Sequence, residues 1–249
     1  MFRKIVNSQK ILCKHFDRLF IPNKFTIDGN HDYKTSFVPK YLTENIIVYD
    51  VGGGKNPFIG TDLKKKLGCK VIGIDIDESE LLRAPKGLYD DVICADITRY
   101  EGQSDGDIVL CRALLEHVPD QDKAIEAIAS LLKKGGYALI FVPSRNALFA
   151  RLNLMLPEKM KKSLISTLQP KAGDNKGFTA FYDKCTPNDF RNLAAAHHLE
   201  VIEERFFYQS SYFNVFFPAY FLWRMWGLAY YAVSGDQAAE TFSICLKKR

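Results

Sequence analysis

Three consecutive glycines, Gly52-Gly53-Gly54, follow directly after an apolar run and stand close to acidic residues. A turn without Cβ atoms lets a ligand approach the backbone closely, and ligands of doubly wound sheets bind beyond the carboxyl ends of the strands. Asp75 ends the next apolar run. A carboxylate at that position can accept hydrogen bonds from both hydroxyls of a ribose, so these residues predict a nucleoside-binding turn.

Two residues near the glycines indicate which class of nucleoside ligand the turn would bind. The dinucleotide fingerprint G-x-G-x-x-G needs glycine or alanine at position 57, where this chain has Pro57. Asp50 precedes the glycines, and its negative charge would repel a pyrophosphate but could hold a cation. A ligand with ribose, adenine and a cationic amino-acid end therefore fits better than NAD.

Short apolar runs that alternate with polar helical stretches must position this turn. Five runs rich in β-branched residues predict strands buried on both faces, at 46–51, 71–75, 91–96, 107–111 and 137–142. A helix is expected over 120–132, ended by Gly135-Gly136, and another is expected to begin at Thr186. Two alternating runs, 199–206 and 241–246, complete the pattern. It predicts an α/β fold, a doubly wound, mostly parallel seven-stranded sheet with an antiparallel last strand and helices on both faces.

The length of 249 residues favours one domain over two. We therefore expect residues 1–249 to form a single domain, with an N-terminal helical cap (1–40) that includes a helix from about Lys10 to Phe20. Residues 144–185 have no strand signal and are expected to form an insertion. The cap, the insertion and residues 178–182 are predicted to lie over the active site.

Several short motifs occur in order along this pattern. They are Asp50-Val51-Gly52-Gly53-Gly54, Val71-Ile72-Gly73-Ile74-Asp75, Cys94-Ala95-Asp96-Ile97, Leu115-Glu116-His117-Val118 and Leu132-Lys133-Lys134-Gly135-Gly136. In this order and spacing the chain resembles the class I S-adenosylmethionine-dependent methyltransferases of small-molecule type. The resemblance covers roughly residues 40 to 145 and, more loosely, 178 to 249. Lys55-Asn56-Pro57 departs from the common pattern and implies a short first helix.

The resemblance implies S-adenosylmethionine as cofactor and S-adenosylhomocysteine as product. Gly52 and Gly54 would approach the methionine part, with Asp50 near its ammonium group. Asp75 would hold the ribose, and Asp96 would accept from the adenine amino group beside the Ile97 N–H. Cys111 and Arg112 would lie beside the sulfonium and its methyl group. The full implied cofactor-binding set is Asp50, Gly52, Gly53, Gly54, Asp75, Ile76, Asp96, Ile97, Cys111 and Arg112.

The implied activity is methyl transfer to a small-molecule or lipid-linked acceptor, with oxygen the favoured acceptor atom. His117 is the candidate catalytic base, because histidine titrates near neutral pH; packing beneath the site is the alternative role. Transfer to a nucleophilic oxygen needs little beyond alignment and desolvation. A non-catalytic module that binds S-adenosylmethionine or S-adenosylhomocysteine is the second functional hypothesis.

Composition excludes several other classes of protein. The net charge is +5 and the basic residues are scattered, and Cys111-Arg112-Ala113-Leu114 replaces any base-flipping motif, so no nucleic-acid partner is expected. The six cysteines form no CxxC pair, which disfavours metal binding and a disulfide framework. Residues 1–24 carry charge throughout and do not read as a signal peptide. The predicted location is cytoplasmic.

Residues 206–235 form an aromatic segment whose one charged residue is Arg224. A helix from Pro218 to near Val233 is too short to span a bilayer. It is either plain protein core, which we favour, or a lid that contacts a lipid-like acceptor or the inner face of the membrane. In the second case the protein would be peripheral at the membrane.

Overall fold

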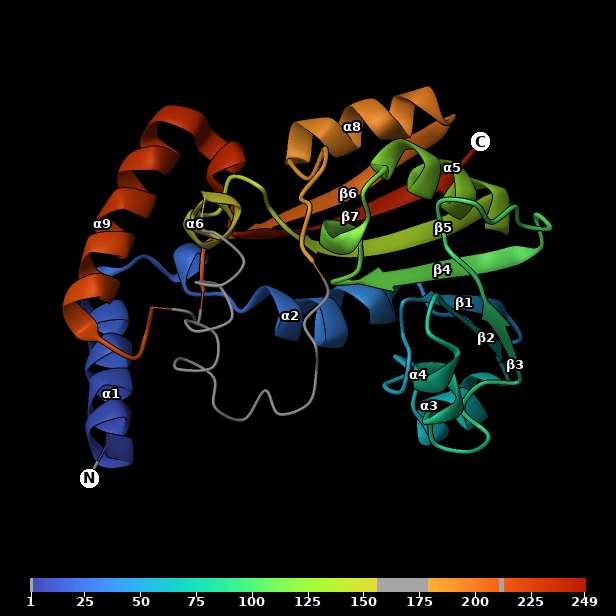
Figure 1. Cartoon of the computed structure of the whole chain (residues 1–249), viewed down its shortest axis with the longest axis horizontal. Coiled ribbons are helices and arrows are strands. Elements are labelled where there is room, and N and C mark those ends of the chain that lie inside the picture. Colours follow the sequence, from blue (N-terminus) through green and yellow to red (C-terminus); the bar gives the residue numbers. More distant parts are fainter. Residues whose placement is uncertain (1, 156–178, 211–212) are drawn as a thin grey trace.

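The computed structural model describes residues 2–155, 179–210 and 213–249, with side chains from residue 5 onward. Within these ranges seven strands form one sheet in the spatial order β3-β2-β1-β4-β5-β7-β6 (Figure 1). The strands are β1 (Ile47–Val51), β2 (Lys70–Asp75), β3 (Asp91–Cys94), β4 (Gly106–Arg112), β5 (Leu132–Pro143), β6 (Leu199–Phe207) and β7 (Thr241–Lys248).

The sheet confirms the predicted doubly wound topology. Strands β1 to β5 pair in parallel, whereas β7 runs antiparallel to both β5 and β6. The strand order reverses between β1 and β4, since β2 lies on one side of β1 and β4 on the other. Ligands of such sheets bind at this switch point, which is where the glycine turn follows β1.

Helices cover both faces of the sheet, as expected. They are α1 (Phe2–Phe20), α2 (Gly29–Asp32), α3 (Thr61–Leu67), α4 (Glu78–Leu82), α5 (Gln121–Leu131), α6 (Leu148–Met155), α8 (Pro187–Ala196) and α9 (Phe217–Ser234). Buried residues of α5 and α8 share one apolar cluster with the sheet. Residues 33–38 and the end of α3 belong to a second cluster on the other face. The sheet is thus enclosed between two apolar cores.

Local sequence explains where two of these helices begin and end. Thr186 and Asp189 form a capping box at α8, with the Asp189 N–H donating to Thr186 Oγ1 at 3.2 Å. Asp120 caps α5 by accepting from the Lys123 N–H at 3.2 Å. The prediction that Gly135-Gly136 end this helix was wrong. Helix α5 ends at Leu131, and both glycines lie within β5, where a Cβ on residue 136 would meet the Gly106 carbonyl oxygen at 2.8 Å.

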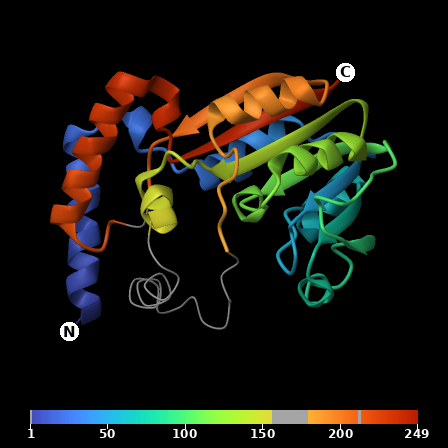
Figure 2. The same cartoon turned by 45° about the horizontal axis from the view of Figure 1, so that its top comes forward.

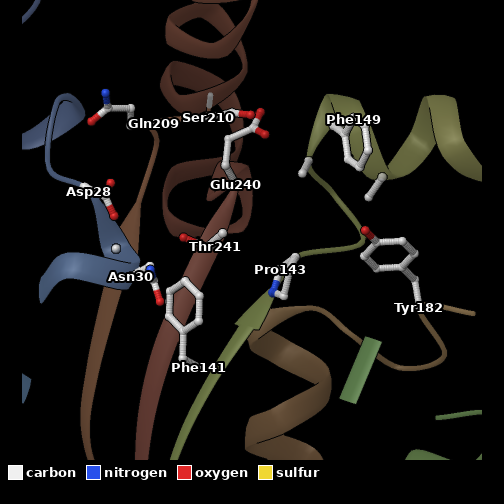
Figure 3. Close-up of a pocket in the computed structure, with 13 residues that line it drawn as sticks. Asp28, Asn30, Phe141, Pro143, Phe149, Tyr182, Gln209, Ser210, Glu240 and Thr241 are labelled. Atoms are coloured by element: carbon white, nitrogen blue, oxygen red, sulfur yellow. The ribbon is translucent and has the colours of Figure 1, made fainter. Parts of the chain in front are cut away.

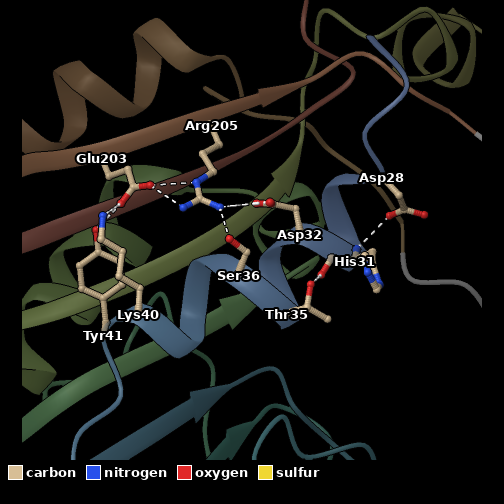
Figure 4. A network of polar contacts seen from close by, with 9 residues as sticks. All are labelled: Asp28, His31, Asp32, Thr35, Ser36, Lys40, Tyr41, Glu203 and Arg205. Atoms are coloured by element: carbon tan, nitrogen blue, oxygen red, sulfur yellow. Dashed lines mark hydrogen bonds and ion pairs between the residues drawn. The ribbon is translucent and has the colours of Figure 1, made fainter. Parts of the chain in front are cut away.

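A polar network fastens the chain between α2 and β1 to strand β6 (Figure 4). Arg205 donates to Asp32 and to Glu203 at 2.9 and 2.8 Å, and Lys40 and Tyr41 donate to the same Glu203 carboxylate at 2.6 and 2.7 Å. Desolvation alone would raise the pKa of Glu203, but these donors outweigh it and lower the pKa to about 2. The network holds the segment that follows α2 against the sheet.

Helices α1 and α9 lie side by side at one end of the molecule in both views (Figures 1 and 2). Helix α1 begins well before the predicted Lys10 and packs on α9. No helix in the described ranges is long and apolar enough to cross a membrane. The predicted insertion contributes α6, while its residues 156–178 lie outside the described residues. That residues 1–40 and 144–185 cap the active site stays a prediction.

Candidate active site

The glycine turn after β1 is shaped by contacts that exclude larger side chains. Gly52 and Gly54 have φ of 74° and 48°, the left-handed region that glycine adopts without strain. A Cβ at position 53 would lie 2.4 Å from the Tyr89 hydroxyl oxygen and 2.7 Å from Asp50 Oδ2. The turn therefore needs glycine at all three positions, two for conformation and one for space.

Asp50 lies beneath this turn and helps to hold it. Its Oδ2 accepts from the Phe58 N–H at 2.7 Å, and the side chain is almost fully buried. Desolvation raises the pKa of Asp50 to about 6, against the lowering effect of the Phe58 N–H and of the nearby Arg112. Its predicted position near a bound ammonium group stays a prediction.

Asp75 ends β2 and faces the turn across a short gap. Its Oδ2 lies 3.2 Å from where a Cβ of Gly54 would stand, and its Oδ1 accepts from the Asp77 N–H at 3.0 Å. Desolvation raises the pKa of Asp75, and the acids Asp77 and Glu80 add to the effect. The structure thus brings the predicted ribose acid and the glycine turn together.

The remaining predicted cofactor contacts, Ile76, Asp96 and Ile97, follow strands β2 and β3. Ile76 is exposed and Ile97 is buried. Asp96 Oδ1 accepts from the N–H and the hydroxyl of Thr98 at 2.9 and 2.8 Å, so Asp96 closes a local turn. Its other carboxylate oxygen lies 3.8 Å from Arg99 Nε. Binding of adenine by Asp96 and the Ile97 N–H stays a prediction, as does the contact of Ile76 with the cofactor.

The segment 112–114, which is the last residue of β4 and the two residues after it, contacts both the glycine turn and the wall of a cavity. Leu114 contacts the turn, since a Cβ at Gly52 would lie 2.9 Å from its methyl groups. Arg112 Nη1 donates to Asn30 Oδ1 at 3.1 Å, and the Ala113 N–H donates to the Phe141 carbonyl at 2.8 Å. Ala113 has φ of 51°, which is strained for a residue with a Cβ and is frequent at functional sites.

The cavity has a volume of about 320 Å³ and opens beyond the carboxyl end of β5 (Figure 3). Its wall combines rings, carboxylates and small polar groups: Asp28, Gly29, Asn30, Phe141, Pro143, Ala147, Phe149, Ala150, Tyr182, Gln209, Ser210, Glu240 and Thr241. Lysine, arginine and histidine are missing from these described lining residues. Asn30 and Phe141 belong to this wall and also contact the segment after β4, so the cavity adjoins the predicted cofactor site.

Sequence reasoning missed Glu240, the buried acid of this wall. Its Oε1 accepts from the Trp223 indole N–H at 2.9 Å. Desolvation raises the pKa of Glu240, against the lowering effect of the Trp223 and Leu148 N–H groups. Glu240 immediately precedes β7 and carries no motif, so its position between the aromatic helix and the last strand was the only signal in the sequence.

Two further predicted residues, Cys111 and His117, lie near the segment after β4. Cys111 is fully buried in β4. The Nδ1 atom of His117 lies 3.2 Å from the Thr179 carbonyl oxygen, and its Nε2 lies 3.7 Å from Glu116 Oε1. His117 is not among the residues that line the cavity. Its role as a catalytic base stays a prediction.

Glu116, a neighbour of His117, is a buried acid that the sequence reading assigned no role. Its Oε2 has no hydrogen-bond partner among the described residues. Desolvation raises its pKa to about 8, so near neutral pH most of this carboxyl is protonated.

A family model described as a methyltransferase domain matches residues 30–204, most of the chain and all of the glycine turn. The chain belongs to this methyltransferase domain family. Solved structures agree on the fold. A S-adenosylmethionine-dependent methyltransferase from Methanosarcina mazei covers 86% of this chain and 97% of its own, at 18% identity and a TM-score of 0.53. Phosphoethanolamine N-methyltransferase 2 of Haemonchus contortus, solved with S-adenosyl-L-methionine, covers 100% of this chain and 60% of its own, at 18% identity and a TM-score of 0.55.

Curated relatives of this methyltransferase domain carry a more specific name. The ubiquinone biosynthesis O-methyltransferase of Cupriavidus pinatubonensis is 26% identical over 166 residues, which are 64% of this chain and 61% of the relative. The enzyme of the same name from Thiobacillus denitrificans is 33% identical over 107 residues, 40% of this chain and 45% of the relative. The chain therefore spans less than two thirds of the length of these relatives.

Proposed function

We propose that this methyltransferase domain is an S-adenosylmethionine-dependent O-methyltransferase whose small acceptor binds in the cavity beyond β5. The observation that carries the proposal is the segment 112–114, which contacts the glycine turn through Leu114 and the cavity wall through Arg112 and Ala113. A cofactor on the turn and an acceptor in the cavity would then meet across one short stretch of chain. The names of the curated relatives support oxygen as the acceptor atom.

The residues of the turn fit the proposed cofactor. The three glycines let side chains of the protein pack closely against the backbone of the turn, and Asp75 offers a half-buried carboxylate beside Gly54. We assign Gly52, Gly53 and Gly54 to the methionine part and Asp75 to the ribose hydroxyls. When bound, S-adenosylmethionine supplies an electrophilic methyl group.

The wall of the cavity indicates the class of acceptor. Phe141, Phe149 and Tyr182 offer apolar ring surface, and the Asp28 and Glu240 carboxylates can accept hydrogen bonds from hydroxyl groups. The charged side chains among the described lining residues are the carboxylates Asp28 and Glu240, and an ionised acceptor carboxylate close to them would meet like-charge repulsion. We therefore propose a hydroxylated, ring-bearing acceptor without a carboxylate. That the acceptor carries a lipid chain is a separate proposal, which the lining of the cavity does not support by itself.

Methyl transfer to a panel of acceptors tests this function. The purified chain would be incubated with methyl-labelled S-adenosylmethionine and a phenol, the same phenol bearing a carboxylate, or a matching amine. We expect label on the phenol oxygen and at least tenfold less transfer to the carboxylate-bearing analogue. Glu240→Gln should lower kcat/KM, whereas the exposed control Glu200→Gln should leave it unchanged.

Two results would count against the proposal. Transfer to the amine in preference to the phenol would contradict oxygen as the acceptor atom. Binding of S-adenosylhomocysteine without transfer to any acceptor would favour the non-catalytic binding module.

A further inference from the structure

Helices α1 and α9 pack into a two-helix unit at one end of the molecule (Figure 1). At the centre of their interface Arg224 Nε donates to Asp17 Oδ1 at 3.0 Å, and the Tyr220 hydroxyl donates to the same carboxylate. Beside this buried ion pair the Phe16 ring packs on Phe217 and Phe221, with centroids 5.7 and 5.5 Å apart. These contacts fix which flank of each helix faces outward.

One outer flank of α1 is apolar along its length. Ile5, Leu12 and Leu19 recur every seven residues and so form one row on the helix, with 52%, 44% and 70% of each residue exposed. Phe20 adjoins this row at 69% exposure, and its ring packs on Phe16, 5.4 Å between centroids. The row therefore lies on the Phe16 side of the interface.

Helix α9 continues this apolar surface. Phe221, which contacts Phe16, is 39% exposed, and Leu222 and Met225 beside it are 67% and 37% exposed. Phe16 thus joins the exposed row of α1 to that of α9. We define the apolar face as Ile5, Leu12, Leu19, Phe20, Phe221, Leu222 and Met225.

The exposed charged residues of α1 lie on its polar side and are basic. Lys10, Lys14 and Arg18 follow one another at four-residue spacing and form an exposed row along the other side of α1. Asp17 is the single acid of α1 and α9, and it is buried in its ion pair with Arg224. No exposed acid of either helix therefore opposes an anionic surface.

We propose that the apolar face of α1 and α9 docks onto an anionic lipid surface, with the helices lying in the plane of the interface. A helix with an apolar flank and a basic polar side has the pattern of interfacial membrane binding. A second copy of the chain is the competing occupant, but α1 and α9 offer no exposed acid that could pair with its basic row. This inference holds whether or not the proposed acceptor chemistry is correct.

Co-sedimentation with lipid vesicles tests the docking. The purified chain should bind vesicles that contain phosphatidylserine, and binding should weaken as salt is raised, because screening removes the attraction of Lys10, Lys14 and Arg18. Leu19→Glu with Leu222→Glu should weaken partitioning at least tenfold. Leu82→Glu is the matched control, since Leu82 is 71% exposed on α4, outside the face, and it should bind like the wild type.

A charge variant and a measurement of mass separate the competing occupants. Lys14→Glu with Arg18→Glu should reduce binding to phosphatidylserine vesicles, and light scattering after gel filtration should give one mass for all variants. Thermal unfolding would confirm that each variant is folded. The proposal would be overturned if the wild type failed to bind vesicles that contain phosphatidylserine. So would a dimer that Leu19→Glu and Leu222→Glu dissociate while vesicle binding is unchanged.

Discussion

Trp223 on α9 donates its indole N–H to the Glu240 carboxylate at 2.9 Å, and this bond joins the aromatic helix to the cavity wall. Both residues are buried, and Glu240 belongs to the cavity lining. The aromatic segment is thus neither plain core nor fully exposed. Its inner side, with Tyr220 and Trp223, is buried as the core reading expected, whereas its outer side exposes Leu222 and Val233.

The Trp223–Glu240 bond should contribute measurably to stability. Trp223→Phe keeps most of the ring but leaves the buried Glu240 without one donor, which we expect to cost about 1–3 kcal/mol. Urea unfolding at neutral pH would measure the loss. Trp226→Phe is the control, since Trp226 is only half-buried and packs on Tyr230. Equal stability of both variants would show that this bond contributes nothing.

The glycine turn predicts a contrast between two alanine substitutions. Gly53→Ala would drive a Cβ into Asp50 and Tyr89, so it should reduce the affinity for S-adenosylhomocysteine at least tenfold and lower the unfolding temperature. Gly60→Ala meets no atom within 4 Å and has φ of −78°, so it should change little. Calorimetric titration of both variants would measure the difference, and similar affinities would contradict the packing described here.

Much of this architecture could be predicted from the sequence, because the spacing of apolar residues and the residue types found at turns and caps depend on short stretches of chain. The strands, the Thr186 cap and the pairing of Asp75 with the glycine turn depend on residues close in sequence or on a regular topology. Glu240 and the α1–α9 unit could not be predicted in this way. The hydrogen bond between Trp223 and Glu240 and the ion pair between Asp17 and Arg224 join segments that are brought together only by the packing of the fold. The prediction for the end of α5 was wrong because Gly136 allows a close approach between β4 and β5, and Gly135 lies in β5 at a positive φ, so neither glycine caps the helix.

Glu116 predicts an unusual dependence of stability on pH. Its pKa is about 8 in the folded protein against an ordinary value of 4.5, so between these values the folded state holds a proton that the unfolded state has released. The contribution of Glu116 to the free energy of unfolding should therefore fall as pH rises from 4.5 to 8. Glu116→Gln should remove this loss, so at pH 8 its free energy of unfolding should exceed that of the wild type by about a few kcal/mol.

Urea unfolding at pH 5 and pH 8 measures this effect. The gain of Glu116→Gln over the wild type should be small at pH 5 and large at pH 8. The exposed control Glu126→Gln, on α5, should show no such dependence. A gain that does not grow with pH would mean that Glu116 is ionised in the folded protein.

The glycine turn and Asp75 together should bind S-adenosylhomocysteine and S-adenosylmethionine. Calorimetric titration of the wild type, of Asp75→Asn and of the exposed control Asp62→Asn tests it most directly. We expect micromolar binding of S-adenosylhomocysteine by the wild type and the control, at least tenfold weaker binding by Asp75→Asn, and no binding of NAD by any of the three. Unchanged affinity in a folded Asp75→Asn variant, or binding of NAD in place of S-adenosylhomocysteine, would contradict it.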